Sequence, residues 1–182
     1  MKTTNRMPLI YGFVRACAIG DVDKGHASGH VAPMPACAAR LAVRAVILHE
    51  NRLLLVNAWP GGSSDLWCAP GGGVEPGQSL PDNLRREVHE ETGLTIRVGA
   101  PCLVNEFHDP GSGFHQVDVY FHAVITGGGL DDAWRDPAGV VDRRRYVTRA
   151  EMSRLRYKPD SLPRIAWDGH GPLYDPLEPM LR

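Results

Sequence analysis

The sequence predicts one folded domain of the mixed α/β (α+β) class, and three features of the chain indicate this. Its 182 residues fit one domain comfortably. Apolar residues make up 43% of the chain, which is enough to build a core. Apolar runs typical of strands and amphipathic runs typical of helices follow one another without strict βαβ alternation. We therefore expect helices to pack around one mixed β-sheet.

Charge and apolar content narrow the class of protein. The net charge is −1, so there is no basic field to attract nucleic acid, and a nucleic-acid partner is disfavoured. No apolar run approaches the ~18–20 residues of a membrane-spanning helix, so no membrane association is expected. We expect a cytoplasmic protein with reduced thiols, and a homodimer is one alternative for its assembly. The cysteines are widely spaced and form no zinc pattern: Cys17, Cys37, Cys68 and Cys102.

The first 36 residues differ from the rest of the chain. They contain no Glu and show neither a helical nor a strand-like apolar period. We expect residues 1–36 to be a flexible extension and residues 37–182 to form the domain, with Met34 as a candidate start. A secretory signal is the alternative reading of the apolar run at 7–14, and Arg15 argues against it because it interrupts that run.

From Arg40 onward the chain reads as strands separated by turns. The segments LAVRAVIL (41–48) and RLLLVNA (52–58) are expected to form a hairpin, because apolar β-branched runs flank a polar turn. A short strand at 66–69 runs into a glycine-rich loop. Further strands are expected at residues 94–107, 114–125 and 146–147.

The clearest helix begins after Ser79. This residue suits the N-cap, and Pro81 suits the first turn. Gly93 fits the left-handed position that ends a helix. Two shorter helices are expected at residues 148–156 and near 161–167. The apolar stripe of the first helix consists of Leu80, Leu84 and Val88.

Three carboxylates lie on one face of this helix. Glu87, Glu90 and Glu91 stand at i, i+3 and i+4, where like charges repel one another, and Arg86 supplies a single positive charge. Hard divalent cations offset such repulsion, and Mg²⁺ prefers carboxylates, waters and substrate phosphates as ligands. Taken alone, the cluster is also compatible with a solvated acidic surface.

The spacing of these residues resembles the Nudix box, GX5EX7REUXEEXGU, in which U is a bulky aliphatic residue. Gly72, five residues, Gln78, seven residues and the segment REVHEETGL (86–94) match it at every fixed position but one. The departure is Gln78, where the family has Glu. Chance agreement over these 23 residues is negligible. With the flanking strands, the resemblance covers residues 38–168.

The resemblance implies the Nudix fold, an α/β/α sandwich around a mixed sheet with a loop–helix–loop metal platform. It implies that Mg²⁺ or Mn²⁺ is the cofactor and that the helix glutamates and the Gly71 carbonyl are its ligands. Arg86 would hold the glutamates in place, and Gln78, with Gly72, would support the platform. The implied catalytic residues are Arg86, Glu87, Glu90 and Glu91.

The implied reaction is attack by water on a nucleoside diphosphate linked to another group, a small-molecule nucleotide substrate. In the family the general base is either a helix glutamate or a carboxylate of a distal loop. Here the loop at 130–142 offers four Asp residues but no Glu, so no base is assigned there.

Substrate choice is set outside the box. Family members that hydrolyse ADP-ribose tend to carry a proline at the spacing that Pro110 has from Leu94, sixteen residues. A Pro-Gly turn between strands would explain the same residue. Trp59 is a candidate for stacking on a nucleobase and Tyr120 for lining the cleft, and ordinary packing is the alternative for both. These features favour ADP-ribose or a nucleotide sugar over a (d)NTP or an oxidised nucleotide.

Two other classes of function are compatible with parts of the sequence. A non-catalytic Nudix-fold module that binds a nucleotide is one, because Gln78 departs from the box. The three glutamates are all present, and they favour an enzyme. An RNA-decapping hydrolase is the other, and it rests on the basic stretch at 143–158, which a solvated surface also explains.

Overall fold

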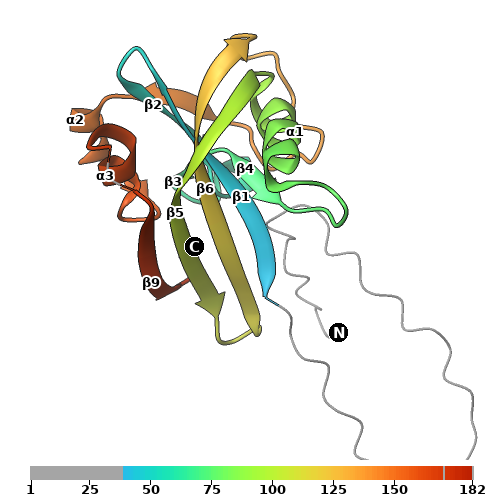
Figure 1. The fold of residues 1–182 in the computed structure, drawn as a ribbon, viewed down its shortest axis with the longest axis vertical. Coiled ribbons are helices and arrows are strands. Elements are labelled where there is room, and N and C mark those ends of the chain that lie inside the picture. Colours follow the sequence, from blue (N-terminus) through green and yellow to red (C-terminus); the bar gives the residue numbers. More distant parts are fainter. Residues whose placement is uncertain (1–38, 170, 182) are drawn as a thin grey trace, which may run out of the picture.

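The computed structural model describes residues 39–169 and 171–181 (Figure 1). The predicted extension at 1–36 lies outside these residues. Within the described ranges, no helix is both long enough and apolar enough to cross a membrane.

The described residues form nine strands, three α-helices and one short 3-10 helix, Pro60–Gly62. The helices are α1 (Leu80–Thr92), α2 (Arg149–Met152) and α3 (Leu162–Trp167). The long strands are β1 (Arg40–His49), β2 (Arg52–Asn57), β5 (Thr95–Asp109) and β6 (Phe114–Gly127). The shorter strands are β3 (Leu66–Cys68), β4 (Gly71–Gly73), β7 (Arg144–Val147), β8 (Arg156–Tyr157) and β9 (Leu173–Pro179).

The sheet is mixed, as predicted. Its order is β8-β3-β2-β1-β6-β5-β9, with β4 paired to β1 and β7 paired to β2. Strands β1 and β6 run parallel over eight residue pairs, from Arg40–Gln116 to Ile47–Ala123. The hairpins β1–β2 and β5–β6 are antiparallel. Parallel and antiparallel pairs therefore occur in the same sheet, which confirms the α+β assignment.

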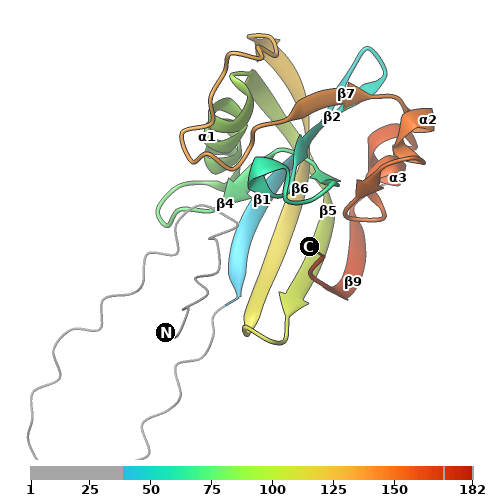
Figure 2. The ribbon, with the colours of Figure 1, turned by 180° about the vertical axis from the view of Figure 1, so that it is seen from behind.

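Helices cover both faces of the sheet, which confirms the sandwich. Helix α1 lies on one side and helices α2 and α3 on the other (Figures 1 and 2). Leu84 and Val88 of α1 pack with Phe121 in one core cluster. Ile165 of α3 packs with Tyr120 in a second cluster. Neighbouring residues of β6 thus enter opposite cores, because successive side chains of a strand point to opposite faces.

Helix α1 begins and ends where the sequence predicted. The Ser79 hydroxyl accepts a hydrogen bond from the Asp82 N–H at 3.2 Å. Gly93 adopts φ 74°, a left-handed conformation that favours glycine. The predicted ends of this helix are therefore confirmed.

The structure differs from the prediction at four elements. The glycine segment expected as a loop is strand β4, because its backbone pairs with β1. Helix α2 ends at Met152 and not near 156, since the following chain turns to pair as β8 with β3. Strands β8 and β9 were not predicted. Strand β9 contains two prolines, which an edge strand tolerates, because within the described part of the chain only one side of its backbone pairs with another strand.

Candidate active site

Helix α1 and strand β4 together form the wall of one open cavity. Glu87, Glu90 and Glu91 all line this cavity of about 780 Å³, with the glycines of β4 opposite them. The i, i+3, i+4 spacing places the three carboxylates on one face of the helix. The structure therefore brings together the carboxylates and the glycines that the sequence singled out.

The first two residues of β4 must be glycines, because other atoms lie very close to their Cα atoms. A Cβ atom on Gly71 would lie 2.1 Å from the Val43 carbonyl oxygen, and Gly71 has φ 137°. A Cβ atom on Gly72 would lie 2.2 Å from the Glu87 Oε2 atom. Gly71 thus allows β4 to pair with β1, and Gly72 leaves room for the Glu87 carboxylate.

Glu91 is the most deeply placed of the three carboxylates. Its side chain is buried, and its Oε2 atom accepts a hydrogen bond from the Gly71 N–H at 2.8 Å. Burial raises the pKa of Glu91 to about 8, although the nearby Arg44 guanidinium acts in the opposite direction. Burial also raises the pKa of Glu87, against the opposing charge of Arg86. Both groups therefore hold a negative charge at a cost that a bound cation would reduce.

Arg86 joins the other two glutamates. Its Nη2 atom lies 2.8 Å from Glu87 Oε1, and its Nη1 atom donates to Glu90 Oε2 at 3.2 Å. The Nη2 atom also donates to Asn83 Oδ1 at 3.2 Å. Arg86 thus has the geometry to hold Glu87 and Glu90, the role that the resemblance implies for it.

Gln78 is exposed and connects to Arg86 through Glu75. Its Nε2 atom donates to Glu75 Oε2 at 3.2 Å, and Glu75 Oε1 lies 3.9 Å from Arg86 Nη2. Sequence reasoning did not single out Glu75. Its position in the loop between β4 and Gln78 was the signal that could have found it, since a second carboxylate there can bond to Arg86.

The donor set fits a divalent cation. Three carboxylates and the Gly71 carbonyl are the hard oxygen ligands that Mg²⁺ and Mn²⁺ accept. Among the described residues, no group of three or more His, Cys, Asp or Glu side chains is already arranged to hold a metal. Instead, Glu87 and Glu90 bond to Arg86, and Glu91 bonds to Gly71. Rotation of these side chains toward the cavity they line would be needed to bind an ion.

Comparison with known proteins decides the family. A family profile described as the NUDIX domain matches residues 38–168. The chain belongs to the Nudix family. An ADP-ribose pyrophosphatase of Methanocaldococcus jannaschii is 31% identical over 51% of this chain and 57% of its own length. A human diphosphoinositol polyphosphate phosphohydrolase, 3-alpha, is 31% identical over 53% of this chain and 55% of its own length. The chain thus spans little more than half the length of these curated relatives.

Solved structures agree on the fold. A NUDIX hydrolase from Nitrosomonas europaea superposes with a TM-score of 0.60 at 21% identity, covering 72% of this chain and 90% of that one. The α/β/α sandwich described above is therefore the Nudix fold.

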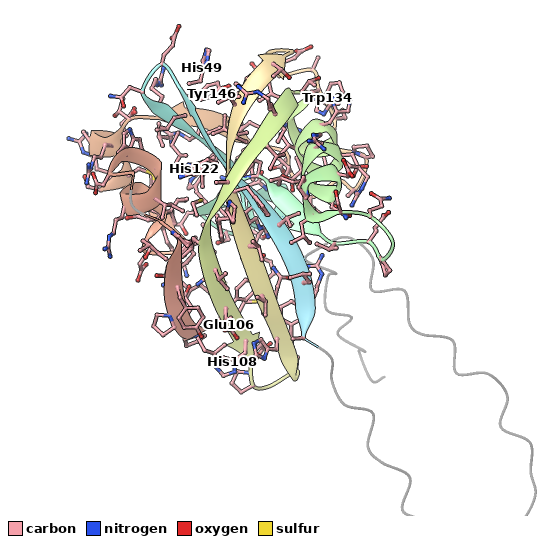
Figure 3. The ribbon with its side chains drawn as sticks, in the orientation of Figure 1. His49, Glu106, His108, His122, Trp134 and Tyr146 are labelled. Atoms are coloured by element: carbon pink, nitrogen blue, oxygen red, sulfur yellow. The ribbon has the colours of Figure 1, made fainter. Side chains whose placement is uncertain are left out.

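The loop after β6 closes one side of the Nudix cavity. Asp136 lines the cavity, but its carboxylate accepts three backbone hydrogen bonds, from the N–H groups of Ala138, Val140 and Val141 at 2.8–2.9 Å. The Trp134 Nε1–H donates to the Glu90 carbonyl oxygen at 2.9 Å, and Figure 3 shows this side chain beside α1. Asp136 therefore shapes the loop, and its bonds make it a poor candidate for a general base.

Trp59 and Tyr120 meet at a second, smaller cavity. Both side chains are buried, and both line a space of about 50 Å³. Sequence reasoning missed the polar members of this cavity, because they come from distant segments: β5, β6, β9 and the residue after β8. These members are Asn105, Asp118, Lys158 and Glu178.

Arg44 lies between the two cavities. It lines the smaller cavity, and its Nη1 atom donates to the Gly71 carbonyl oxygen at 2.7 Å. Its Nε atom lies 3.5 Å from Asp118 Oδ1, and both side chains are almost fully buried. A single arginine within the apolar run of β1 was the signal that could have found this residue, since a buried charge needs a partner.

Pro110 lies in the exposed turn between β5 and β6. The Asp109 carboxylate stabilises this turn by accepting a hydrogen bond from the Gly111 N–H at 3.1 Å. Pro110 lines neither of the two cavities described above. Its role in substrate binding remains a prediction from spacing.

Proposed function

We propose that this Nudix protein is a pyrophosphohydrolase that uses Mg²⁺ or Mn²⁺ to cleave a diphosphate linkage in a small-molecule nucleotide. The observation that supports it most directly is the shared cavity of Glu87, Glu90 and Glu91 opposite the glycines of β4. In the reaction, water adds across one P–O–P linkage. One phosphorus gains the water oxygen, and the other phosphoryl group leaves with the bridging oxygen.

The residues of the box and their neighbours would have different roles in this reaction. A bound divalent ion lowers the pKa of water and neutralises charge on the diphosphate. The three glutamates and the Gly71 carbonyl would bind it. Gly71 already accepts a hydrogen bond from Arg44, and a carbonyl oxygen has a second lone pair for another partner. Arg86 would position Glu87 and Glu90, and Gln78 would act on Arg86 through Glu75.

For the substrate, we propose ADP-ribose or a nucleotide sugar, with a (d)NTP or an oxidised nucleotide as the second candidate. The spacing of Pro110 supports the first class, as does the Methanocaldococcus relative named an ADP-ribose pyrophosphatase. The aromatic walls of the smaller cavity, Trp59, Phe107 and Tyr120, suit the flat face of a nucleobase. A non-catalytic binding module is the rival, and the complete set of glutamates argues against it.

A hydrolysis screen tests the proposal. The full chain would be incubated with Mg²⁺ and, in turn, ADP-ribose, UDP-glucose, dGTP, 8-oxo-dGTP and a diphosphoinositol polyphosphate. We expect the largest kcat/KM for ADP-ribose or UDP-glucose, and no turnover in excess chelator. A clear preference for a triphosphate or for the inositol compound would reverse the proposed substrate.

Two glutamate variants and a control test the metal site. Glu90→Gln and Glu91→Gln are expected to lower both Mg²⁺ affinity and rate. Glu50→Gln removes a carboxylate from the exposed β1–β2 turn and should leave both unchanged. Unchanged Mg²⁺-dependent turnover in both glutamate variants would refute the metal site. A chain that binds ADP but hydrolyses none of the five compounds would be a binding module.

A further inference from the structure

The C-terminal segment of the chain lines the smaller cavity. Strand β9 pairs parallel with β5, and Figure 2 shows the C-terminus beside β5. The Met180 N–H donates to the His108 carbonyl oxygen at 2.9 Å. Met180 and Leu181 line the cavity and pack against the apolar cluster that contains Trp59 and Cys68. Two apolar side chains of the chain's own end therefore fill space beside the aromatic wall.

A carboxylate of the same segment, that of Glu178, binds two polar side chains of the cavity. Glu178 Oε2 lies 2.5 Å from the Lys158 ammonium, and Glu178 Oε1 accepts a hydrogen bond from the Asn105 amide at 3.4 Å. All three residues line the cavity. The donors that could bind a ligand's oxygen or ring nitrogen atoms are thus bonded to the chain itself.

The remaining space is too small for a substrate. Ligand pockets commonly measure ~300–1,000 Å³, whereas this cavity measures about 50 Å³. The cavity is also next to the metal platform, because Arg44 lines it and bonds to the Gly71 carbonyl. A nucleoside placed there would have its diphosphate near the glutamates of α1, provided that the C-terminal segment moved.

We propose that residues Glu178–Leu181 form an autoinhibitory strap over the nucleoside site, an inference that rests on the function proposed above. Met180 and Leu181 occupy the place of the nucleobase. The Glu178 carboxylate binds Asn105 and Lys158, the hydrogen-bond donors that the base would otherwise use. A nucleotide must displace the strap before Asn105 and Lys158 can bind it. The apparent affinity is therefore reduced by the fraction of molecules in which the strap is closed.

Weakening the strap in the full chain should strengthen nucleotide binding. Glu178→Gln removes the ion pair with Lys158 and keeps the size of the side chain. Asp160→Asn is the matched control, because Asp160 is an exposed partner of the same ammonium, at 3.1 Å, outside the cavity lining. Calorimetric titration with ADP and Mg²⁺ should give a Kd roughly three- to ten-fold lower for Glu178→Gln. The control should match the wild type.

The rate at which a thiol reagent modifies Cys68 shows whether the strap covers the cavity, and this measurement does not depend on enzymatic activity. Cys68 lines the cavity and is 8% exposed, whereas Cys102 is 1% exposed in another core cluster. In a chain with Cys17→Ser and Cys37→Ser, ending at Leu177, methyl methanethiosulfonate should modify Cys68 at least about ten-fold faster than in the chain of full length. Cys102 should stay protected in both, which shows that the fold is kept.

The outcomes separate the strap from the proposed reaction. Faster labelling of Cys68 in the shortened chain, together with tighter ADP binding by Glu178→Gln, supports the strap even if no compound is hydrolysed. Unchanged labelling of Cys68 in the shortened chain overturns it. Faster labelling with equal or weaker ADP binding also overturns it, because the segment is then a wall of the site. Should the shortened chain fail to fold, the ADP affinity of full-length Glu178→Gln decides the question.

Discussion

The Glu91 carboxylate accepts a hydrogen bond from the backbone N–H of Gly71, at 2.8 Å, and both residues are buried. This bond connects strand β4, where the Nudix box begins, to helix α1, since Gly71 belongs to β4 and Glu91 to the last turn of α1. The bond fixes the carboxylate beside the backbone of Gly71, in the cavity proposed to hold the metal. Burial of the carboxylate there has an electrostatic cost for the folded chain.

The first prediction is that Glu91→Gln stabilises the metal-free protein at alkaline pH. Burial raises the pKa of Glu91 to about 8, whereas a Glu in an unfolded chain titrates near ~4.3. The folded state therefore binds the carboxyl proton of Glu91 more tightly than the unfolded state does. The contribution of this proton to the free energy of unfolding is complete below pH ~4.3 and is lost as the pH rises through about 8. Gln does not titrate, so the variant avoids this loss.

Thermal denaturation in chelator checks this prediction. The two proteins should melt at similar temperatures near pH 4, and the variant should melt at least about 3 °C higher at pH 8.5. Added Mg²⁺ should raise the Tm of the wild type more than that of the variant, because binding to the folded state stabilises it. Equal melting temperatures at pH 8.5 in chelator would contradict the prediction.

The second prediction concerns Gln78, the one departure from the box. Its side chain is exposed and bonds to Glu75, so Gln78→Glu places a carboxylate beside another carboxylate and not beside Gly71. We expect kcat to change by less than about ten-fold. Glu87→Gln should lower kcat by about 10³-fold or more, because it removes a proposed metal ligand. The measurement is kcat of both variants and of the wild type at saturating Mg²⁺. If Gln78→Glu activates an otherwise inactive chain, the natural protein is a degenerate binding module.

The third prediction is that Gly72→Ala impairs activity more than folding. The new methyl group would lie 2.2 Å from Glu87 Oε2, the end of a flexible side chain, so the carboxylate would move and the backbone would keep its place. We expect a fall in kcat/KM of at least about 10²-fold with a Tm within a few degrees of the wild type. Gly129→Ala is the control, because no atom of the described residues lies within 4 Å of its Cβ position. A large loss of Tm with normal specific activity would show that Gly72 serves folding alone.

The fourth prediction is that residues 1–36 are dispensable. They lack an apolar period, and the NUDIX profile begins at residue 38. A protein that starts at Met34 should keep its Tm within about 4 °C and its kcat/KM within about two-fold. Parallel melting curves and rates of the two proteins provide the measurement. Unfolding of the shorter protein would show that the segment is a structural arm of the domain.

The sequence by itself determined the family, the class of fold and the helix that bears the carboxylates. These features depend on residues that are close in the chain: the fixed spacing of the box, the cap at Ser79 and the left-handed Gly93. The long strands β1, β2, β5 and β6 were also predictable. Strands β1 and β2 carry continuous apolar runs between turn residues, and β6 alternates apolar and polar side chains.

Only the tertiary structure decided how the remaining groups meet. Asn105 and Glu178 are 73 residues apart, and Arg44 and Gly71 are 27 apart, yet each pair shares a hydrogen bond. Strand β9 is short and carries two prolines, so its local sequence has no strand period, and pairing with β5 gives it its conformation. Local periodicity specifies elements and their faces, whereas the partner of a buried charge or the cover of a cavity depends on which distant segments the sheet places side by side.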